Sequence, residues 1–99
     1  KTAIEINPNF AIAYVNLGIT LGEKGDSGAA ITHYKTAIKI NPNSPETYNN
    51  LGIGLAQQGS LKEAINYFQE ALRLKPDLIS ARRNLEMAIR LYGEAGESK

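Results

Sequence analysis

The sequence predicts an all-α protein in which pairs of helices stack side by side. Residues 11–44 and 45–78 match each other at a constant offset of 34 residues, and Pro8, Pro42 and Pro76 mark the same period. Within each unit, apolar residues recur every three or four positions, which is the spacing of one helix face. A glycine in the middle of each unit suits a turn between two helices. A repeat of this length indicates a linear stack of helical units.

Residues 1–9 nearly repeat residues 35–43 and differ from them only in Glu5 against Lys39. They are therefore expected to be the last turns of a second helix whose unit is otherwise missing. We interpret the chain as a fragment of a longer protein; the alternative is a short leader that docks on the helix from Ile12. The uncovered apolar side chains of this stretch predict self-association through the N-terminal end; they are Ala3, Ile4 and Ile6.

Capping signals place the helix starts. Ser44 is expected to cap a helix that begins with proline. Ser60 and Glu63 have the spacing of a capping box, which predicts a stronger helix start than Asp26, because Ala29 replaces the glutamate there. Four helices are expected in the two units: over 11–23, over 27–40, from Pro45 and from Leu61.

The segment after the second unit begins as a first helix but departs from the pattern. Arg82 stands where Tyr48 stood, and Glu86 stands where Gly52 stood, so a closely packed following helix is not expected. It reads as a capping helix with a polar outer side. The predicted single domain thus contains the tail of a truncated repeat (1–10), two complete repeats (11–44 and 45–78), a capping helix (79–92) and a flexible tail (93–99).

The order of large and small residues in each unit resembles the tetratricopeptide repeat. It is carried in one unit by Tyr14, Leu17, Gly18, Leu21, Gly25, Ala30, Tyr34, Ala37 and Pro42, and in the next by Tyr48, Leu51, Gly52, Leu55, Gly59, Ala64, Phe68, Ala71 and Pro76. Tyrosine replaces the frequent tryptophan of that family, and leucine replaces its second tyrosine. The resemblance implies an α-solenoid, that is, a right-handed superhelix whose first helices line a concave groove for a protein or peptide partner.

Composition and charge argue against several other functions. The net charge of +1 does not favour nucleic-acid binding, and the absence of cysteine excludes disulfides and thiolate metal sites. No apolar run is long enough for a membrane span, and no signal-peptide pattern opens the chain. His33 reads as a surface residue without catalytic neighbours. We expect no enzyme, no metal and no cofactor, and the compartment stays open.

Two rows of residues are expected on the groove side of the first helices. The first row consists of Asn16, Asn50 and Asn84, and asparagine is a poor residue for a helix interior. The carboxamide has both a donor and an acceptor, so a row of them could hold the backbone of an extended peptide. The second, apolar row could receive its side chains. The predicted peptide-binding residues are Asn16, Asn50, Asn84, Val15, Ile19, Ile53 and Met87.

The asparagine row is similar to the asparagine ladder in the repeat array of O-linked N-acetylglucosamine transferases. The alternative is that each asparagine bonds a neighbouring helix and sets the pitch of the stack. A carboxylate clamp for chaperone C-termini, known in the same family, is not expected. Of the positions that would carry it, only Asn50 fits; the others hold Val15, Ile19, Ser80 and Asn84.

The sequence therefore predicts a protein-interaction module that binds an extended peptide segment in its groove. Two further functions stay open. The array could be the substrate-recruiting segment of a larger enzyme such as a glycosyltransferase, or it could be a structural spacer or self-assembly unit.

Overall fold

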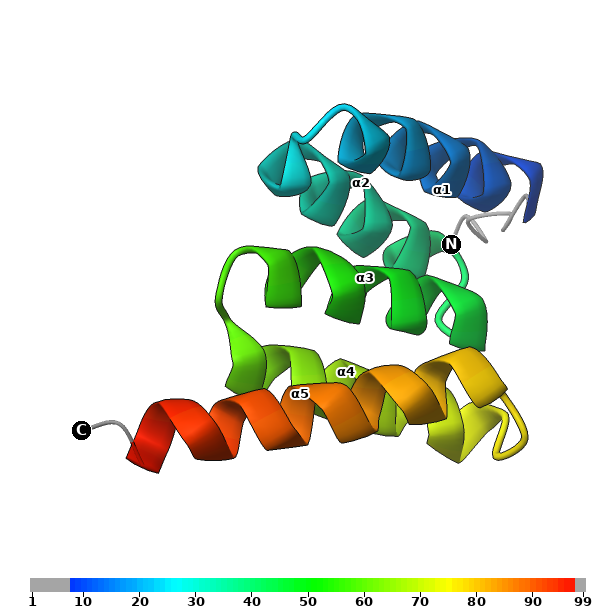
Figure 1. The fold of residues 1–99 in the computed structure, drawn as a ribbon. Coiled ribbons are helices and arrows are strands. Elements are labelled where there is room, and N and C mark those ends of the chain that lie inside the picture. The colour runs from blue at the N-terminus through cyan, green and yellow to red at the C-terminus, as the bar shows by residue number, and fades with distance from the viewer. Residues whose placement is uncertain (1–7, 98–99) are drawn as a thin grey trace.

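The structure, a computed structural model, describes residues 8–97 and contains five α-helices and no strand within that range. The helices form an elongated stack with principal extents of 52 × 29 × 25 Å. Successive helices run antiparallel, so α1, α3 and α5 point in the same direction (Figure 1). Their bounds are Pro8–Glu23 (α1), Ser27–Ile40 (α2), Pro45–Gln57 (α3), Leu61–Leu74 (α4) and Ile79–Glu97 (α5).

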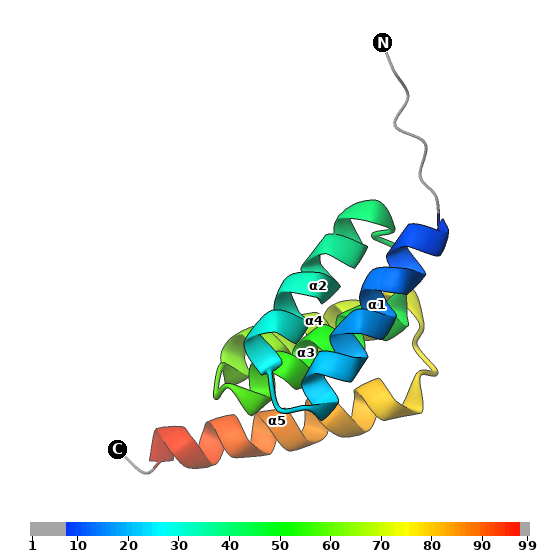
Figure 2. The same ribbon diagram turned by 90° about the horizontal axis from the view of Figure 1, so that it is seen from above.

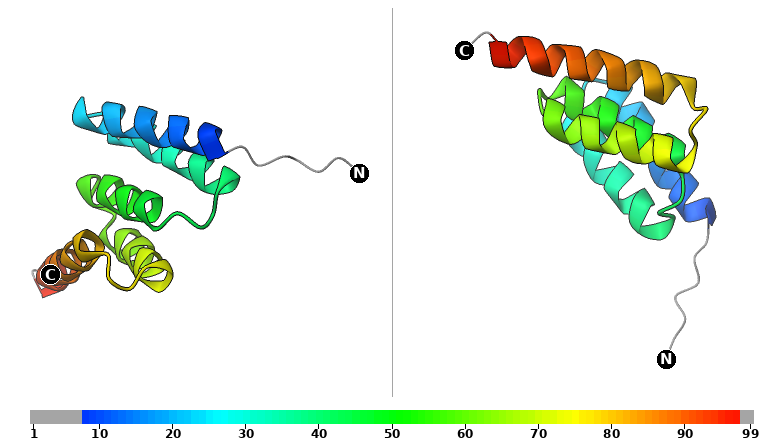
Figure 3. Two further views of the ribbon diagram at one scale, coloured as in Figure 1. Left: turned by 90° about the vertical axis from the view of Figure 1, so that its right-hand side faces the viewer. Right: turned by 90° about the horizontal axis from the view of Figure 1, so that it is seen from below.

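The helices alternate between two layers. An end-on view places α1, α3 and α5 on one side and α2 and α4 on the other (Figure 3). We call the α1–α3–α5 side the inner face and the α2–α4 side the outer face. Seen from above, α1 and α2 lie over α3 and α4, and α5 extends past them (Figure 2). This layered arrangement of helix pairs confirms the predicted all-α stack.

Each helix pair turns at a glycine. Gly25 and Gly59 have φ values of +89° and +84°, a left-handed conformation that only glycine adopts at little cost. The residue after each glycine forms a backbone hydrogen bond that ends the preceding helix. The N–H of Asp26 donates to Leu21 O and the N–H of Ser60 donates to Leu55 O, both at 2.9 Å. Both turns were expected from the glycine positions.

The caps only partly follow the prediction. Ser44 caps α3, with its side chain accepting from the N–H of Thr47 at 3.4 Å, and Pro45 follows in the first turn. Asp26 accepts from the N–H of Ala29 at 3.1 Å, whereas the Ser60 side chain makes no capping bond to α4. The expectation that Ser60 gives the stronger helix start is therefore wrong. A carboxylate is the stronger acceptor, and it needs no glutamate partner to cap a helix.

One contact between a glycine and an aromatic ring holds each helix pair together. A Cβ on Gly18 would lie 2.6 Å from Tyr34 Cε1, and one on Gly52 would lie 2.5 Å from Phe68 Cε1, so both rings rest on bare backbone. Around Phe68 the core is fully closed, with Leu51 and Ala64 both buried. These contacts explain why helix-breaking glycine recurs in the first helix of each unit.

A second contact joins α3 and α5 to the proline turn that precedes each of them. The Tyr48 hydroxyl donates to Pro42 O at 3.0 Å, and Arg82 Nη2 donates to Pro76 O at 3.1 Å. The two residues occupy the same place in successive units, six residues after the proline. Arg82, which reads as a departure from the repeat, therefore preserves the contact by a different chemical group.

Both ends of the stack differ from the prediction. α1 begins at Pro8 rather than Ala11, because proline fits the first turn of a helix and Phe10 stands where Ser44 caps α3. α5 passes through Gly93 to Glu97, so the expected end at Tyr92 is wrong. Gly93 and Gly96 each cost the helix only about 1 kcal/mol, and no proline interrupts it. The expectations for Ala3, Ile4 and Ile6 lie outside the described residues.

No helix in the described range is both long and apolar enough to cross a membrane.

Candidate functional site

Two hollows open on the inner face, one on each side of Ile53 in α3. The first has a volume of about 240 Å³ and lies where α1, α2 and α3 meet. Its lining combines apolar side chains with a tyrosine, two amides and a carboxylate: Ile19, Gly22, Glu23, Ala30, Tyr34, Asn50, Ile53, Gly54 and Gln57. It is thus a mixed apolar and polar site at the junction of the two repeats.

The second hollow lies between α3, α4 and α5 and has a volume of about 230 Å³. It is more apolar than the first and is lined by no charged residue: Ile53, Ala56, Gln57, Leu61, Phe68, Asn84, Met87, Ala88 and Leu91. Because Ile53 and Gln57 line both hollows, the two form neighbouring positions along the inner face. Their separation by a single helix suits a chain that places successive side chains in each.

Most predicted site residues gather at these hollows. Ile19, Asn50 and Ile53 line the first, and Asn84, Met87 and Ile53 line the second. Val15 is half-buried and lines a smaller hollow of about 130 Å³ between α1 and α3. Asn16 is exposed on α1 and lines neither of the two main hollows.

The three asparagines are not equivalent. Asn84 Nδ2 donates to Asn49 Oδ1 at 3.0 Å, and Asn49 Nδ2 donates to Ser80 Oγ at 3.2 Å, which links α3 to α5. Asn16 and Asn50 make no side-chain hydrogen bond with the described part of the chain. One member of the row thus joins two helices, as the packing alternative expects, while two keep their amides available.

The repeat pattern did not predict the part that Asn49 plays in this link. It is only 7% exposed, and it is one of two buried polar residues in the described chain. The matching positions hold Val15 and Arg83, so the 34-residue comparison offers no sign of a buried amide. The only sign in the sequence of a buried amide at this position is that Asn49 directly precedes a member of the asparagine row.

Electrostatics in the first hollow centre on Tyr34 and Glu23. Burial raises the pKa of the Tyr34 hydroxyl above its ordinary value, and the negative charge of Glu23 raises it further. Tyr34 therefore stays neutral and can donate a hydrogen bond at physiological pH. Glu23 is the one charged residue in the lining of this hollow.

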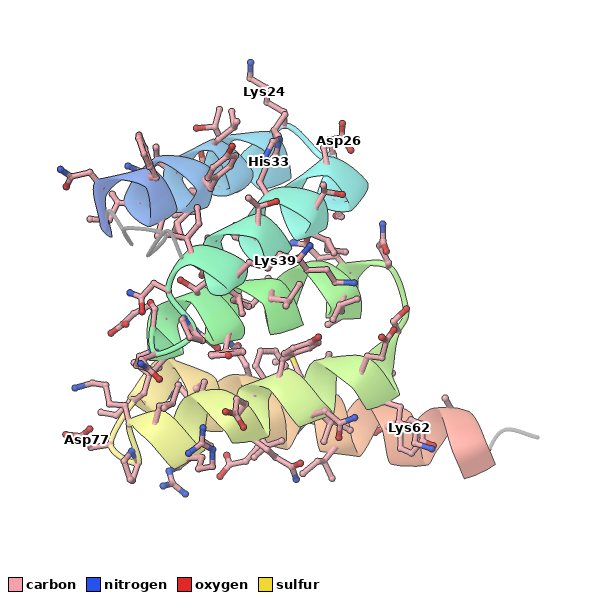
Figure 4. The ribbon with its side chains drawn as sticks, turned by 180° about the vertical axis from the view of Figure 1, so that it is seen from behind. Lys24, Asp26, His33, Lys39, Lys62 and Asp77 are labelled. Atoms are coloured by element: carbon pink, nitrogen blue, oxygen red, sulfur yellow. The ribbon has the colours of Figure 1, made fainter. Side chains whose placement is uncertain are left out.

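The outer face carries an aromatic pair in each unit. Tyr14 stacks on His33 with ring centroids 5.9 Å apart, and Tyr48 stacks on Tyr67 at 6.1 Å. The two pairs are related by the 34-residue offset. His33 is thus half-buried on the outer face, seen on α2 next to α1 in Figure 4, where its ring packs on Tyr14. Its alignment with Tyr67 could have revealed this.

No group of three His, Asp or Glu side chains within residues 8–97 could hold a metal ion.

Comparison with protein families decides the identity of the fold. A family model for the tetratricopeptide repeat matches residues 11–77, which is most of the chain. The chain belongs to the tetratricopeptide repeat family. Tetratricopeptide repeats are in general non-catalytic modules for protein interaction, and no enzyme family is indicated. A comparison with curated proteins finds no match.

Two solved structures show the same tetratricopeptide architecture. The TPR2AB domain of yeast Sti1, in its complex with pHSP90, superposes with a TM-score of 0.87 and 26% identity over 93% of this chain and 36% of that one. The C-terminal domain of a Plasmodium falciparum protein of the FK506-binding class, which contains such repeats, gives 0.83 and 26% over 91% and 60%. The chain thus spans less than two thirds of either structure.

Proposed function

We propose that the inner face binds an extended peptide segment of a partner protein, with apolar side chains in the two hollows beside Ile53. The observation that carries the proposal is that six of the seven expected contact residues line hollows on this face. Five of them, Ile19, Asn50, Ile53, Asn84 and Met87, line the two main hollows. Apolar pockets with a few polar groups are the usual form of a binding site.

Backbone contacts to the peptide would come from amides that the fold does not use. Asn50 lies between the two repeats with its carboxamide unbonded, and Asn16 occupies the same place one unit earlier. Asn84 contributes less, because one of its N–H groups already serves Asn49. A neutral hydrogen bond contributes about 0.5–1.5 kcal/mol net, so we expect micromolar or weaker affinity that is tolerant of sequence.

The peptide we propose is apolar rather than an acidic chain terminus. The yeast Sti1 domain is seen with pHSP90, but the clamp positions of this chain hold Val15, Ile19 and Ser80 instead of basic or amide residues. Ser80 is moreover occupied, since it accepts from Asn49. Glu23 in the first hollow would repel a carboxylate.

Two other functions each have one supporting observation. The asparagine row resembles that of O-linked N-acetylglucosamine transferases, which favours a segment that recruits substrate to a larger enzyme. The bond between Asn84 and Asn49 favours a structural spacer, because it joins two helices without a ligand. The free amides of Asn16 and Asn50 have no role in a spacer, so the peptide-binding proposal explains more of the row.

The test is selection of short random peptides against the full chain, followed by affinity measurement with the double variant Asn16→Ala, Asn50→Ala. We expect selected peptides to be rich in apolar residues, and the double variant to bind them about 5- to 150-fold more weakly, as expected for two lost hydrogen bonds. Its melting temperature should be equal or slightly higher, because alanine is the better helix former.

Gln69→Ala is the matched control, because it removes an exposed carboxamide from α4 on the outer face. It should leave peptide affinity unchanged. Unchanged affinity in the double variant would contradict the proposal, and so would selection of acidic peptides. Failure to select any peptide from a folded chain would favour the spacer.

A further inference from the structure

A third hollow opens on the outer face, beside the aromatic pair of the second unit. Its volume is about 400 Å³, and its lining comes from one residue of α3 and one stripe of α4: Tyr48, Glu63, Asn66, Tyr67 and Glu70. Tyr48 lies about 200° around α3 from Asn50, so this hollow faces away from the inner face. α4, which supplies the stripe, faces the viewer in Figure 4.

The aromatic floor of this hollow is held in a fixed orientation. The rings of Tyr48 and Tyr67 stack with an angle of 18° between their planes. The Tyr48 hydroxyl is anchored by its bond to Pro42 O at 3.0 Å, so the ring cannot turn freely. A rigid aromatic surface is what a cation needs, because its attraction to the negative face of a ring requires a defined position.

Two carboxylates flank the rings, and no basic residue is among the lining. Glu63 and Glu70 lie one turn before and one turn after Tyr67 on the same stripe of α4. Arg73 donates from Nε to both oxygens of Glu70 at 3.1 Å, which keeps that carboxylate ionised and fixed in place. Glu63 makes no ion pair within residues 8–97, so its charge is available to a ligand.

The first unit provides an internal comparison. It has the same stacked pair in Tyr14 and His33, so the fold accounts for the rings. At the positions of the flanking polar residues it has no charge: they hold Ala29, Thr32 and Thr36. The fold therefore does not require Glu63 and Glu70, and their presence beside one pair only is a property of the second unit.

We propose that this hollow is a second binding site, for the guanidinium group of an arginine side chain on a partner protein. The guanidinium plane would stack on the exposed part of the Tyr67 ring and donate to Glu63, whereas the charge of Glu70 is already paired with Arg73. Arginine fits better than lysine, since its planar fork both stacks on a ring and pairs with a carboxylate. This proposal is independent of peptide binding at the inner face.

The experiment is an NMR titration of the ¹⁵N-labelled full chain with a glycine-flanked arginine peptide. Parallel titrations use the matched citrulline peptide, which has the same shape without charge, and the matched lysine peptide. We expect saturable shifts of the amides of Tyr48, Glu63, Tyr67 and Glu70, with arginine bound about tenfold more tightly than citrulline and more tightly than lysine. The amides of Asn50 and Ile53 should not move.

Glu63→Gln should weaken arginine binding about three- to tenfold. Its melting temperature should fall only slightly, because the exposed side chain loses no contact other than that of its charge with the N-terminus of α4. Glu86→Gln, an equally exposed change on α5, should have no effect. Equal affinity for arginine and citrulline would overturn the proposal. So would equal or tighter binding of lysine, shifts confined to the inner face, or unaltered binding by the Glu63 variant.

Discussion

The contact that defines each unit joins one glycine to one aromatic ring. Gly52 and Phe68 are both buried, and the ring lies where any side chain at position 52 would point. Gly18 and Tyr34 repeat the arrangement one unit earlier. The closeness of the two helices in a pair therefore depends on single missing Cβ atoms.

Gly52→Ala tests this dependence. The new Cβ would lie 2.5 Å from Phe68 Cε1, so the buried ring has to shift to make room for it. Overpacking costs about 1–3 kcal/mol. We expect that to exceed the gain in helix propensity of about 1 kcal/mol, so urea denaturation should show a lower free energy of unfolding.

Gly22→Ala serves as the control, because its Cβ would meet only Ala30 Cβ at 3.9 Å. That variant should be more stable than the parent chain by up to about 1 kcal/mol. If both variants gained stability, the closeness of Gly52 to Phe68 would not limit the packing.

Tyr34 makes stability sensitive to alkaline pH. Its pKa in the fold is raised by burial and by Glu23 above the value near 10 that it has in an unfolded chain. The fold therefore favours the neutral phenol. This contribution is complete below about pH 10 and is lost as the pH rises from there through the folded pKa.

Tyr34→Phe should flatten the fall in melting temperature above about pH 10, because phenylalanine cannot ionise. The measurement is thermal unfolding followed by circular dichroism across the alkaline range. Tyr92→Phe, at an exposed position of α5, should leave the parent profile unchanged. An identical alkaline fall in the Tyr34 variant would refute the assignment.

Much of the residue-level packing could be predicted from the sequence because it repeats. Gly18, Gly52 and Phe68 recur or align at a fixed offset, and each offset pair supports the other. Asn49 could not be placed in the same way. Asn49 has no polar counterpart, and its burial depends on a contact with α5 that only the three-dimensional stack creates.

At the scale of the helices, the strengths of the two N-caps are reversed from what the sequence predicts. Asp26 bonds the N–H of Ala29, while the Ser60 side chain bonds none of the first N–H groups of α4. Asp26→Ala should therefore lower the free energy of unfolding by about 0.5–2 kcal/mol. Ser60→Ala should lower it by less, as measured by urea denaturation of the two variants side by side.

Equal losses in the two variants would mean that Ser60 caps α4 in solution. A larger loss for Ser60→Ala would restore the capping-box prediction.

The link from α5 to α3 gives the asparagine row its own stability test. Asn84→Ala removes the donor to the buried Asn49 carboxamide, which costs about 1–3 kcal/mol when a buried polar group loses its partner. The higher helix propensity of alanine raises the free energy of unfolding by at most about 0.7 kcal/mol. Chemical denaturation should thus show that Asn84→Ala is less stable than the parent chain.

Asn16→Ala should instead be equal or slightly more stable, because Asn16 is exposed and makes no side-chain bond with the described chain. Destabilisation by both changes to a similar extent would assign the whole row to helix packing.

Helix ends were harder to predict than helix existence. α2 lies over Ser27–Ile40 as expected, since Asp26 and Asn41 flank it with clear start and stop signals. α1 and α5 lack such signals at the expected boundaries, and both helices run further. The two hollows of the inner face are lined by residues at equivalent positions of the repeat. The difference between Asn84 and the other two asparagines, Asn16 and Asn50, depends on the bond from Asn84 to Asn49, which has no equivalent in the repeat.

At the scale of the whole molecule, the stack leaves large apolar side chains uncovered on α1. Phe10 is 60% exposed, Ile12 55% and Leu17 44%. Leu51, the counterpart of Leu17 in the next unit, is fully buried, because α2 and α4 enclose it from both sides. Apolar surface of this kind tends to find a partner.

We propose that the chain associates with a second copy through this face. Sedimentation velocity should show a concentration-dependent increase in mass, and the double variant Phe10→Ser, Leu17→Gln should shift the chain to monomer. Ile89→Gln, which is equally exposed on α5, is the control and should not change the mass. A monomer at high concentration of the parent chain would exclude the proposal.

The contacts of α3 and α5 with the preceding proline turns bear on how such arrays diverge. Tyr48 and Arg82 reach the same carbonyl position although one is a neutral phenol and the other a cation. The contact requires a side chain that is long enough to reach the proline carbonyl and that ends in a hydrogen-bond donor; tyrosine and arginine both meet this requirement. Mutation at this site can therefore alter the surface charge of one unit while its geometry is inherited unchanged.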